Sequence, residues 1–153
     1  RRKKMREIEV SMLTDVIEKL CIEANEHLPS DVKEAIKRCR ACEDGEIAKG
    51  VLDNIIENFD IADQENVPIC QDTGMAVVFL EVGQDVHLTG GNVEDAVNEG
   101  VRQGYVDGYL RKSVVKDPIY RENTKDNTPA IIHYSIVPGD SCQDNRGTEG
   151  IWQ

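Results

Sequence analysis

The sequence predicts an α+β fold, in which N-terminal helices are followed by a small, mostly antiparallel sheet with a glycine-containing helix packed against it. Before Pro68, apolar residues recur every three or four positions, as on one face of a helix. After Gly74, short apolar runs and alternating patterns are typical of strands. The stretch V-P-I-C-Q-D-T-G at 67–74 joins the two halves, because its proline excludes a continuous helix and its glycine permits a sharp turn.

Length and composition limit the class of protein. A chain of 153 residues suits one domain and can bury roughly 68–70% of its unfolded surface. A net charge of -11 with few aromatic residues argues against nucleic acid as a partner. The five cysteines are an odd number without a framework spacing, which favours reduced thiols. No apolar run approaches the roughly 18 residues of a membrane span, so we expect a soluble, cytoplasmic protein.

Three helices are predicted before Pro68. The first carries an apolar stripe between Leu13 and Ala24. Ser30 is the expected N-cap of the second helix and Asp44 that of the third. The second helix contains Cys39-Arg40-Ala41-Cys42, which is half of a zinc or redox site. No second CxxC is present, and no strand precedes this one as in a thioredoxin unit, so a structural role is the favoured interpretation.

The second half of the chain is predicted to contain strands and one helix. Residues 75–82 form an apolar run expected to be a strand buried on both faces, and 86–88 a short second strand. Asn92 is expected to cap a helix from Val93 to about Lys112. Glycines at 100, 104 and 108 of this helix favour close approach by another element, because each costs up to about 1 kcal/mol relative to alanine. The strand-turn-helix GxGxxG of a phosphate-binding loop is lacking. Residues 131–137 alternate as a half-buried strand does.

Two stretches carry candidate functional groups. Cys70 stands next to an amide, a carboxylate and a hydroxyl, a set that could hold a metal and a small polar ligand together. Arg111 and Lys112 are adjacent cations that could bind carboxylates, although basic residues at a helix C-terminus are the commoner explanation. The polar segment N-T-K-D-N-T-P at 123–129 either closes over a site or simply turns.

Five ordered motifs then resemble a known family. They are P-I-C-Q-D-T-G at 68–74, G-Q-D-V-H at 83–87, E-G-V-R-Q-G-Y at 99–105, L-R-K-S at 110–113 and N-T-K-D-N-T-P-A at 123–130. Together they resemble the N-terminal part of the α subunit, or α region, of the iron-sulfur class I fumarate hydratases, the fumarase and tartrate dehydratase family. The resemblance covers roughly Arg6 to Asp140.

The resemblance implies a hydro-lyase of the tricarboxylic acid cycle that reversibly hydrates fumarate to L-malate on a [4Fe-4S] cluster held by three cysteines. In such a cluster, an iron with an open position acts as a Lewis acid and activates water. The first cluster cysteine of the family falls on Cys70, which makes it the candidate metal ligand. Gln71 and Asp72 match substrate-contacting residues, with Asp72 the candidate catalytic base. Arg111 matches an arginine that binds a substrate carboxylate.

The resemblance also implies what the complete enzyme adds. Family α regions continue further and carry the two other cluster cysteines there, so one of three expected ligands is present and we expect this chain to be inactive alone. The other four cysteines do not occupy family motif positions. A small dicarboxylate substrate, a β subunit or C-terminal β region, and an oligomeric complete enzyme are the expected partners.

The last thirteen residues, 141–153, leave the family pattern, so we divide the chain into 1–140 and this tail. The family usually continues here along the lines of I-T-V-A-P-K-G-F-G-S. A coding string for that segment, ATA ACC GTG GCA CCG AAG GGA TTT GGC AG, gives D-N-R-G-T-E-G-I-W-Q when read one base earlier with a leading G. Those are residues 144–153 in order. We therefore hypothesise that the tail is an out-of-frame reading, and we expect it to pack loosely.

Alternatives to a fumarate hydro-lyase remain open at this point. An L-tartrate or methylfumarate hydro-lyase of the same family shares the cysteine motif. A non-catalytic module could bind a dicarboxylate or a partner subunit without a cluster. A small metal-binding protein would instead use Cys39, Cys42 and Cys70 together.

Overall fold

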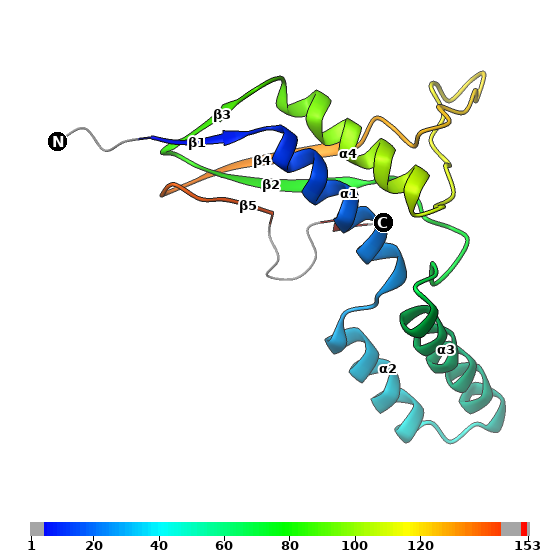
Figure 1. Cartoon of the computed structure of the whole chain (residues 1–153). Helices are drawn as coiled ribbons and strands as arrows, with labels where there is room; N and C mark the ends of the chain where they lie inside the picture. Colours follow the sequence, from blue (N-terminus) through cyan, green and yellow to red (C-terminus); the bar gives the residue numbers. More distant parts are fainter. Residues whose placement is uncertain (1–4, 145–150, 153) are drawn as a thin grey trace. The chain divides into compact units, whose positions relative to one another are not determined.

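The computed structural model describes residues 5–144 and 151–152 (Figure 1). Four helices lie among them, α1 (Ser11–Glu26), α2 (Ser30–Cys42), α3 (Glu46–Glu65) and α4 (Val93–Asp107). The strands are β1 (Arg6–Glu9), β2 (Val77–Gly83), β3 (Val86–Thr89), β4 (Ile131–Val137), β5 (Cys142–Asp144) and β6 (Ile151–Trp152). The chain divides into two compact units. We call Arg1–Ile22 with Asp72–Gln153 the sheet unit, and Glu23–Gln71 the hairpin unit.

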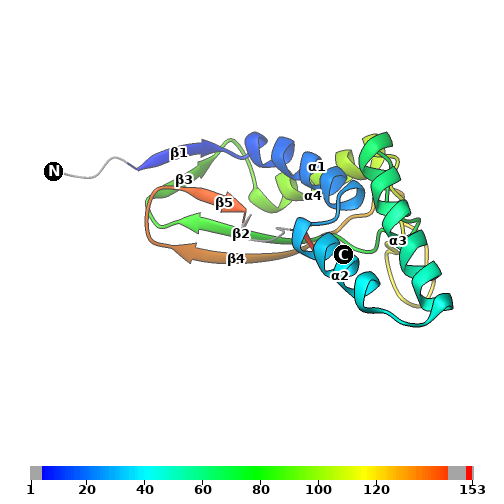
Figure 2. The same cartoon turned by 90° about the horizontal axis from the view of Figure 1, so that it is seen from below.

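The α+β class is confirmed, but the strand directions differ from the expected, mostly antiparallel sheet. In the main sheet, β2 lies between β4 and β5, and β6 also pairs with β2 (Figure 2). The seven-residue pairing of β2 with β4 is parallel, and so is that of β1 with β3. The shorter pairings of β2 with β5 and β6 are antiparallel. Because β3, α4 and a long loop lie between β2 and β4, the chain returns to the same end of the sheet and can pair in parallel.

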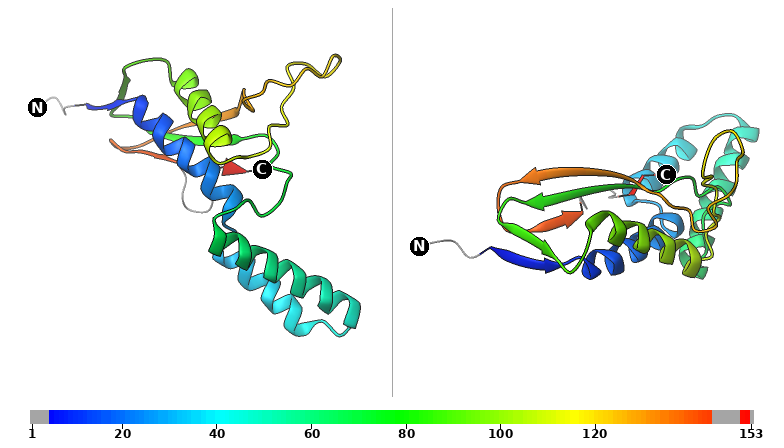
Figure 3. Two further views of the ribbon diagram at one scale, coloured as in Figure 1. Left: turned by 45° about the vertical axis from the view of Figure 1, so that its right-hand side comes forward. Right: turned by 90° about the horizontal axis from the view of Figure 1, so that it is seen from above.

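Two helix segments of the sheet unit, residues 11–22 of α1 and the whole of α4, pack at very short range (Figure 3). A Cβ atom on Gly100 would lie 2.7 Å from the carbonyl oxygen of Thr14, and one on Gly104 would lie 2.8 Å from that of Glu18. The Thr14 hydroxyl also donates a hydrogen bond of 2.9 Å to the Ala96 carbonyl. The prediction of a closely packed glycine helix is therefore confirmed, and the glycines are required because any side chain would collide with α1.

The core of the sheet unit is built from α1, α4 and one face of β2. Side chains alternate along β2, where Val78, Leu80 and Val82 are buried and the residues between them are half-buried. The expectation of a strand buried on both faces is therefore wrong, because one face of β2 keeps partial contact with solvent. The helices contribute the fully buried Val97, Val101 and Tyr105 among others.

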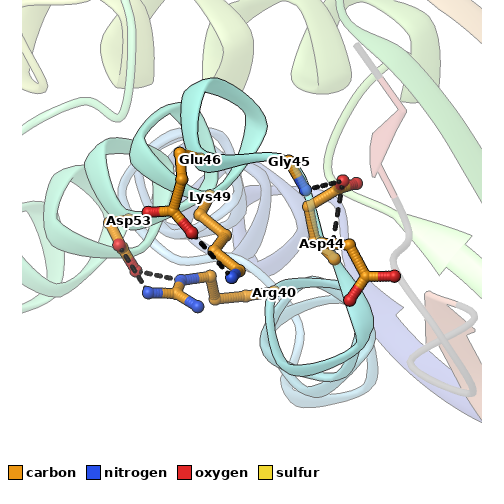
Figure 4. A network of polar contacts seen from close by, with 7 residues as sticks. Arg40, Asp44, Gly45, Glu46, Lys49 and Asp53 are labelled. Carbon is orange, nitrogen blue, oxygen red and sulfur yellow. Dashed lines mark hydrogen bonds and ion pairs between the residues drawn. The ribbon is translucent and has the colours of Figure 1, made fainter.

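The hairpin unit is held together differently. Helix α2 has no buried residue, and its Arg40 donates hydrogen bonds of 2.6 and 2.9 Å to the Asp53 carboxylate of α3 (Figure 4). At the other end of the hairpin, Asp63 of α3 accepts a hydrogen bond from Lys33 of α2 and lies 2.8 Å from the ring of His27. Ion pairs therefore link the two helices along their length.

Several predicted helix ends differ from the observed ones. The Asn92 cap is confirmed, since its side chain accepts hydrogen bonds from the backbone N–H groups of Glu94 and Asp95. Ser30 is already the first residue of α2, and the N-cap of α3 is Gly45 rather than Asp44. Helix α4 ends at Asp107, earlier than expected.

Both ends of the described chain form strands that were not expected from the sequence. Strand β1 was not expected from the sequence. The described residues of the tail pair with β2 as β5 and β6, in contrast to the loose packing expected there, and residues 145–150 and 153 lie outside the described part. No helix in the described part is long and apolar enough to cross a membrane.

Candidate active site

The first part of the 67–74 segment belongs to the hairpin unit. Helix α3 ends at Glu65 and is capped by Asn66, which has a left-handed backbone and donates its N–H to the Ala62 carbonyl. Both backbone groups of Ile69 are then bonded, because its N–H donates to the Asn25 carbonyl and its C=O accepts from the Asn58 amide, each at 2.9 Å. Cys70 follows this fixed residue directly and is exposed. The local backbone thus presents the thiol to solvent from an anchored position.

The second part of the segment belongs to the sheet unit and is buried there. Thr73 is 1% exposed, and its hydroxyl donates a hydrogen bond of 2.5 Å to the Arg111 carbonyl. The Thr73 carbonyl in turn accepts a hydrogen bond of 3.1 Å from the Tyr105 hydroxyl of α4. Gly74 follows with φ of 57°, a left-handed conformation that glycine adopts without strain. Thr73 therefore fixes the backbone on which Asp72 stands.

Asn127 joins the same backbone to two further segments. Its side chain is fully buried, and its Oδ1 accepts hydrogen bonds from the N–H groups of Ser113 and Val114 at 2.7 and 3.1 Å. Its Nδ2 donates to the Gly74 carbonyl at 3.1 Å. One amide side chain thereby satisfies three backbone groups from segments far apart in the sequence, which matters because an unpaired buried polar group is costly.

The segment that carries Arg111 has an unusual backbone. Among the described residues, the non-glycine positions with positive φ are Asn66, Tyr109, Arg121, Lys125 and Asn127, and four of these five fall between 109 and 127. Such conformations persist only where the surrounding structure enforces them, and they gather at functional sites. Here the backbone is held by hydrogen bonds. The Asn127 side chain makes three of them, and the Asn123 amide donates another of 2.8 Å to the Lys112 carbonyl.

Asp72 and Arg111, the two candidate substrate-binding residues of the sheet unit, are brought together at the level of the backbone. Asp72 directly precedes Thr73, whose hydroxyl bonds the carbonyl of Arg111. Both side chains are exposed. Within the described part of the chain, the Arg111 guanidinium makes no ion pair, whereas the neighbouring cations Arg102 and Lys116 are paired with Glu99 and Glu122. Arg111 can therefore offer its guanidinium to an anionic ligand. Gln71, the last residue of the hairpin unit, is exposed as well.

Arg102, in contrast to Arg111, is held in an ion pair with Glu99 of the same helix. It donates two hydrogen bonds to the Glu99 carboxylate, which lower the pKa of Glu99 from its usual 4.5 to about 2. A carboxylate held in this way stays ionised and bound to its own helix. Arg102 is therefore committed to Glu99, which leaves Arg111 as the better candidate for binding an anion.

The residues present do not form a complete metal site. Over the described ranges, no group of three or more His, Cys, Asp or Glu side chains could hold a metal ion. The three-cysteine site that the small metal-binding alternative requires is therefore not formed by Cys39, Cys42 and Cys70. None of the five cysteines is in a disulfide, and burial raises the pKa of the Cys21 thiol to about 12, so Cys21 is a core residue rather than a ligand.

The residues that organise this region are not those the sequence singled out. Thr73, Tyr105 and Asn127 were missed as positioning residues. The polar segment at 123–129 was recognised, but a buried asparagine and an exposed one look alike in a turn-forming stretch. The only local signal was that Thr73, Tyr105 and Asn127 all lie inside motifs of the family resemblance.

Comparison with known proteins decides the family. The model of the fumarate hydratase (Fumerase) family matches residues 14–145, which is most of the chain. The chain belongs to the Fumerase family. This membership agrees with the resemblance of the five motifs, and it makes the chain part of a hydro-lyase family.

Relatives of this Fumerase chain carry two kinds of name. It is 40% identical over 116 residues to a Methanocaldococcus jannaschii protein provisionally named L(+)-tartrate dehydratase subunit alpha, covering 75% of this chain and 40% of the relative. It is 33% identical over 109 residues to a Geobacillus stearothermophilus protein provisionally named fumarate hydratase class I, covering 71% and 21%. The L(+)-tartrate dehydratase subunit alpha of Escherichia coli K12 is 28% identical over 141 residues, covering 92% and 45%. The chain thus spans less than half the length of these curated relatives.

Proposed function

We propose that this chain is the N-terminal part of the α region of a [4Fe-4S] hydro-lyase that hydrates fumarate to L-malate. The family match over residues 14–145 is the observation that carries the proposal. The hydrogen bond between Thr73 and Arg111 supports the proposed roles, because it ties the segment of the candidate base to that of the candidate carboxylate-binding residue.

L-tartrate is the second candidate substrate. It is favoured by the 40% identical relative, which is named for tartrate, whereas the relative named for fumarate is 33% identical. Fumarate and L-tartrate are both four-carbon dicarboxylates. Water is added to fumarate and removed from L-tartrate. The same guanidinium could therefore bind a carboxylate of either.

The proposed roles follow from the difficulty of the reaction. In the dehydration direction, a proton leaves the carbon next to one carboxylate, and negative charge builds up on that carboxylate. The C–O bond on the neighbouring carbon then breaks, and its hydroxide leaves to form water. Arg111 binds the carboxylate with two parallel hydrogen bonds and stabilises the charge in the transition state. Asp72 accepts the proton as general base. Gln71 offers an amide that can orient the substrate by donating and accepting hydrogen bonds.

Cys70 is proposed as one of three cluster ligands. An exposed thiol on an anchored backbone suits this role, since thiolates are the usual ligands of iron-sulfur clusters. The described residues alone do not fit a complete cluster, and we derive no reaction step through it. The remaining ligands, and with them a β subunit or β region, are proposed to come from parts of the enzyme outside this chain, in an oligomeric, cytoplasmic protein.

The test uses the complete gene product, reconstituted anaerobically with iron and sulfide. We expect turnover of fumarate or L-tartrate, measured alongside methylfumarate, and a brown protein with cluster absorbance. Cys70→Ser should remove both the absorbance and the turnover, whereas Cys39→Ser, which changes another exposed cysteine, should keep them. Full turnover in the Cys70→Ser protein would refute the assignment, and ligand binding without turnover in the reconstituted parent would favour a non-catalytic module.

We also propose that the family region ends near residue 140 and that the tail is an out-of-frame reading. The family match ends at residue 145, close to Asp144, where the alternative reading begins, and this supports the proposal. Resequencing the gene tests it directly. We expect a single-base difference that restores the strand and glycine-rich loop of the family. An uninterrupted gene that encodes this same tail would contradict the proposal.

A further inference from the structure

Tyr105 of α4 bonds the backbone of both segments of the candidate active site. It is 1% exposed, and its hydroxyl donates a hydrogen bond of 3.1 Å to the carbonyl of Thr73, the residue after Asp72. Its own backbone carbonyl accepts a hydrogen bond of 3.2 Å from the N–H of Leu110, the residue before Arg111. One buried residue therefore holds the chain beside the candidate base and the chain beside the candidate carboxylate-binding residue.

The same two segments are also joined directly to each other. The Thr73 hydroxyl donates to the Arg111 carbonyl at 2.5 Å. The fully buried Asn127 side chain donates to the Gly74 carbonyl at 3.1 Å and accepts from two backbone N–H groups just beyond Arg111. The consecutive carbonyls of Thr73 and Gly74 are thus both bonded by buried side chains. Because each peptide unit is planar, these two bonds fix the course of the backbone directly after the candidate base.

The position of Tyr105 is itself fixed by the contact between α4 and α1. A Cβ atom on the preceding Gly104 would lie 2.7 Å from the Cβ atom of Cys21 and 2.8 Å from the carbonyl oxygen of Glu18, so α4 has no room to shift toward α1. Displacement within such a close-packed interior is costly. The motif E-G-V-R-Q-G-Y at 99–105 contains none of the candidate cluster, base or substrate-binding residues. Its glycines and its tyrosine are explained together if the motif supports the site.

Proton removal depends more steeply on the position of the backbone than substrate binding does. In the dehydration of L-malate, the base takes a proton from carbon, the electron pair of that C–H bond forms the double bond, and the C–O bond on the neighbouring carbon breaks. The base must lie within hydrogen-bond reach of the proton, and a misplacement of about 1 Å can slow a reaction about 10²-fold. The Arg111 side chain is long and exposed, so it can follow a small backbone shift and keep its carboxylate. Loss of backbone support should therefore lower kcat more than it raises KM.

We propose that Tyr105 is a positioning residue of this reaction, a role that rests on the proposed hydro-lyase function. Through the Thr73 carbonyl, the Tyr105 hydroxyl holds Asp72 at the distance from which its carboxylate removes the proton. Because Tyr105 is buried, it acts on the backbone and not on the substrate. The hydrogen bonds that carry this role are internal to the sheet unit, so they do not depend on which outer surfaces the rest of the enzyme covers.

Tyr105→Phe in the complete gene product, reconstituted anaerobically, tests this role, because it keeps the ring in the core and removes only the hydroxyl. With L-malate, or L-tartrate if that is the substrate, we expect kcat to fall about tenfold and KM to change by less than about twofold. Deuterium on the carbon that loses its proton should lower kcat by a larger factor in the variant than in the parent, because proton removal becomes rate-limiting.

Two control variants should leave kcat and the isotope effect unchanged. Tyr109→Phe makes the same chemical change at a side chain that is 92% exposed. Val97→Ala removes two methyl groups from a fully buried residue of the same helix, so it destabilises the fold and keeps the Tyr105 hydroxyl. Thermal unfolding of all three variants shows that stability alone does not account for a loss of rate in Tyr105→Phe.

A second pair of variants keeps the test decisive if Tyr105→Phe does not fold. Thr73→Val has the shape of threonine but lacks the hydroxyl that bonds the Arg111 carbonyl, and it should slow turnover as Tyr105→Phe does. Thr73→Ser keeps a hydroxyl and should recover most of the rate. Equal kcat values in the valine and serine variants would overturn the inference.

The kinetic outcomes separate this role from the proposed function. A parent that turns over, with kcat and the isotope effect of Tyr105→Phe within about twofold of it, overturns the role of Tyr105 and leaves the function standing. A loss in Val97→Ala as large as that in Tyr105→Phe also overturns the role, because it would trace the effect to stability. A parent without turnover of fumarate, L-tartrate or methylfumarate would overturn the function itself, and the role of Tyr105 with it.

Discussion

Two pairs of helical segments in this chain are held together in opposite ways. In the sheet unit, α1 and α4 approach so closely that glycine is required, and the helices bury Val97, Val101 and Tyr105 almost completely. In the hairpin unit, α2 buries no residue, and α3 buries only Phe59 and Ala62 while it leaves Ile47 87% exposed. There, ion pairs connect the helices, and Lys33 and Lys37 each lie within 6 Å of the centre of the Phe59 ring, at 5.7 and 5.5 Å.

The two kinds of contact predict which solution conditions each unit should resist. Burial of apolar surface is insensitive to moderate salt and acid, whereas exposed ion pairs are screened by salt and lost when the carboxylate is protonated. The hairpin unit should therefore respond to salt and pH under conditions in which the sheet unit does not. Amide hydrogen exchange, read separately for α2 and α4, measures both units in one sample.

The largest effect is expected for the buried polar network of the sheet unit. Asn127→Ala leaves the Gly74 carbonyl and the N–H groups of Ser113 and Val114 unpaired, so we expect a loss of about 3 kcal/mol in unfolding free energy by urea denaturation. Lys125→Ala is the control, because residue 125 has a similar left-handed backbone, with φ of 70°, and an exposed side chain. Equal losses in the two variants would mean that backbone conformation, and not the amide, is what matters.

The next effect contrasts two helical glycines. Gly104→Ala forces a methyl group to within 2.7 Å of the Cys21 Cβ and 2.8 Å of a backbone oxygen, so we expect destabilisation of about 2 kcal/mol. Gly50→Ala in α3 meets nothing within 4 Å and should instead stabilise the hairpin unit by up to about 1 kcal/mol. Thermal unfolding of both variants provides the measurement. Stabilisation by Gly104→Ala would show that the α1 and α4 contact is looser than described.

A smaller effect is expected from the ion pair between α2 and α3. Arg40→Gln should speed hydrogen exchange in α2 at low salt, and the difference from the parent should disappear at high salt because the pair is exposed. Arg38→Gln is the control, since Arg38 lies 3.9 Å from Glu34 on the same helix and does not reach α3. A salt-independent effect of Arg40→Gln would mean that packing, rather than charge, links the helices.

The smallest effect concerns acid. Hydrogen bonds from Lys33 and His27 hold the pKa of Asp63 below its usual 3.8. A carboxyl group whose pKa is lowered on folding stabilises the fold above the usual value, and this stabilisation is lost as pH falls through the lowered value. Exchange in α2 should therefore speed up as the pH falls below the usual 3.8 of an aspartate, beyond its intrinsic pH dependence. Asp63→Asn should remove this added dependence and Asp60→Asn should keep it; the reverse pattern would exclude Asp63 as the cause.

Local structure could be predicted wherever it depends on residues that are close together in the sequence. The apolar stripes of the first and third helices, the Asn92 cap and the bounds of β4 all depend on residues a few positions apart. The Fumerase motifs likewise stand in continuous stretches, so the family and the candidate residues Cys70, Gln71, Asp72 and Arg111 could be named before any fold was known. The end of α4 was missed because Gly108 and the left-handed Tyr109 stop the helix.

The α+β class, the family and the position of the motif segment could be predicted from the sequence alone, because each depends on residue type and spacing over short distances. Two features became known from the fold: β4 runs parallel to β2 at the edge of the described sheet, and Asn127 is buried between Gly74 and Val114. These outcomes depend on which distant segments meet, and a polar side chain does not reveal in the sequence whether water or a buried carbonyl will be its partner.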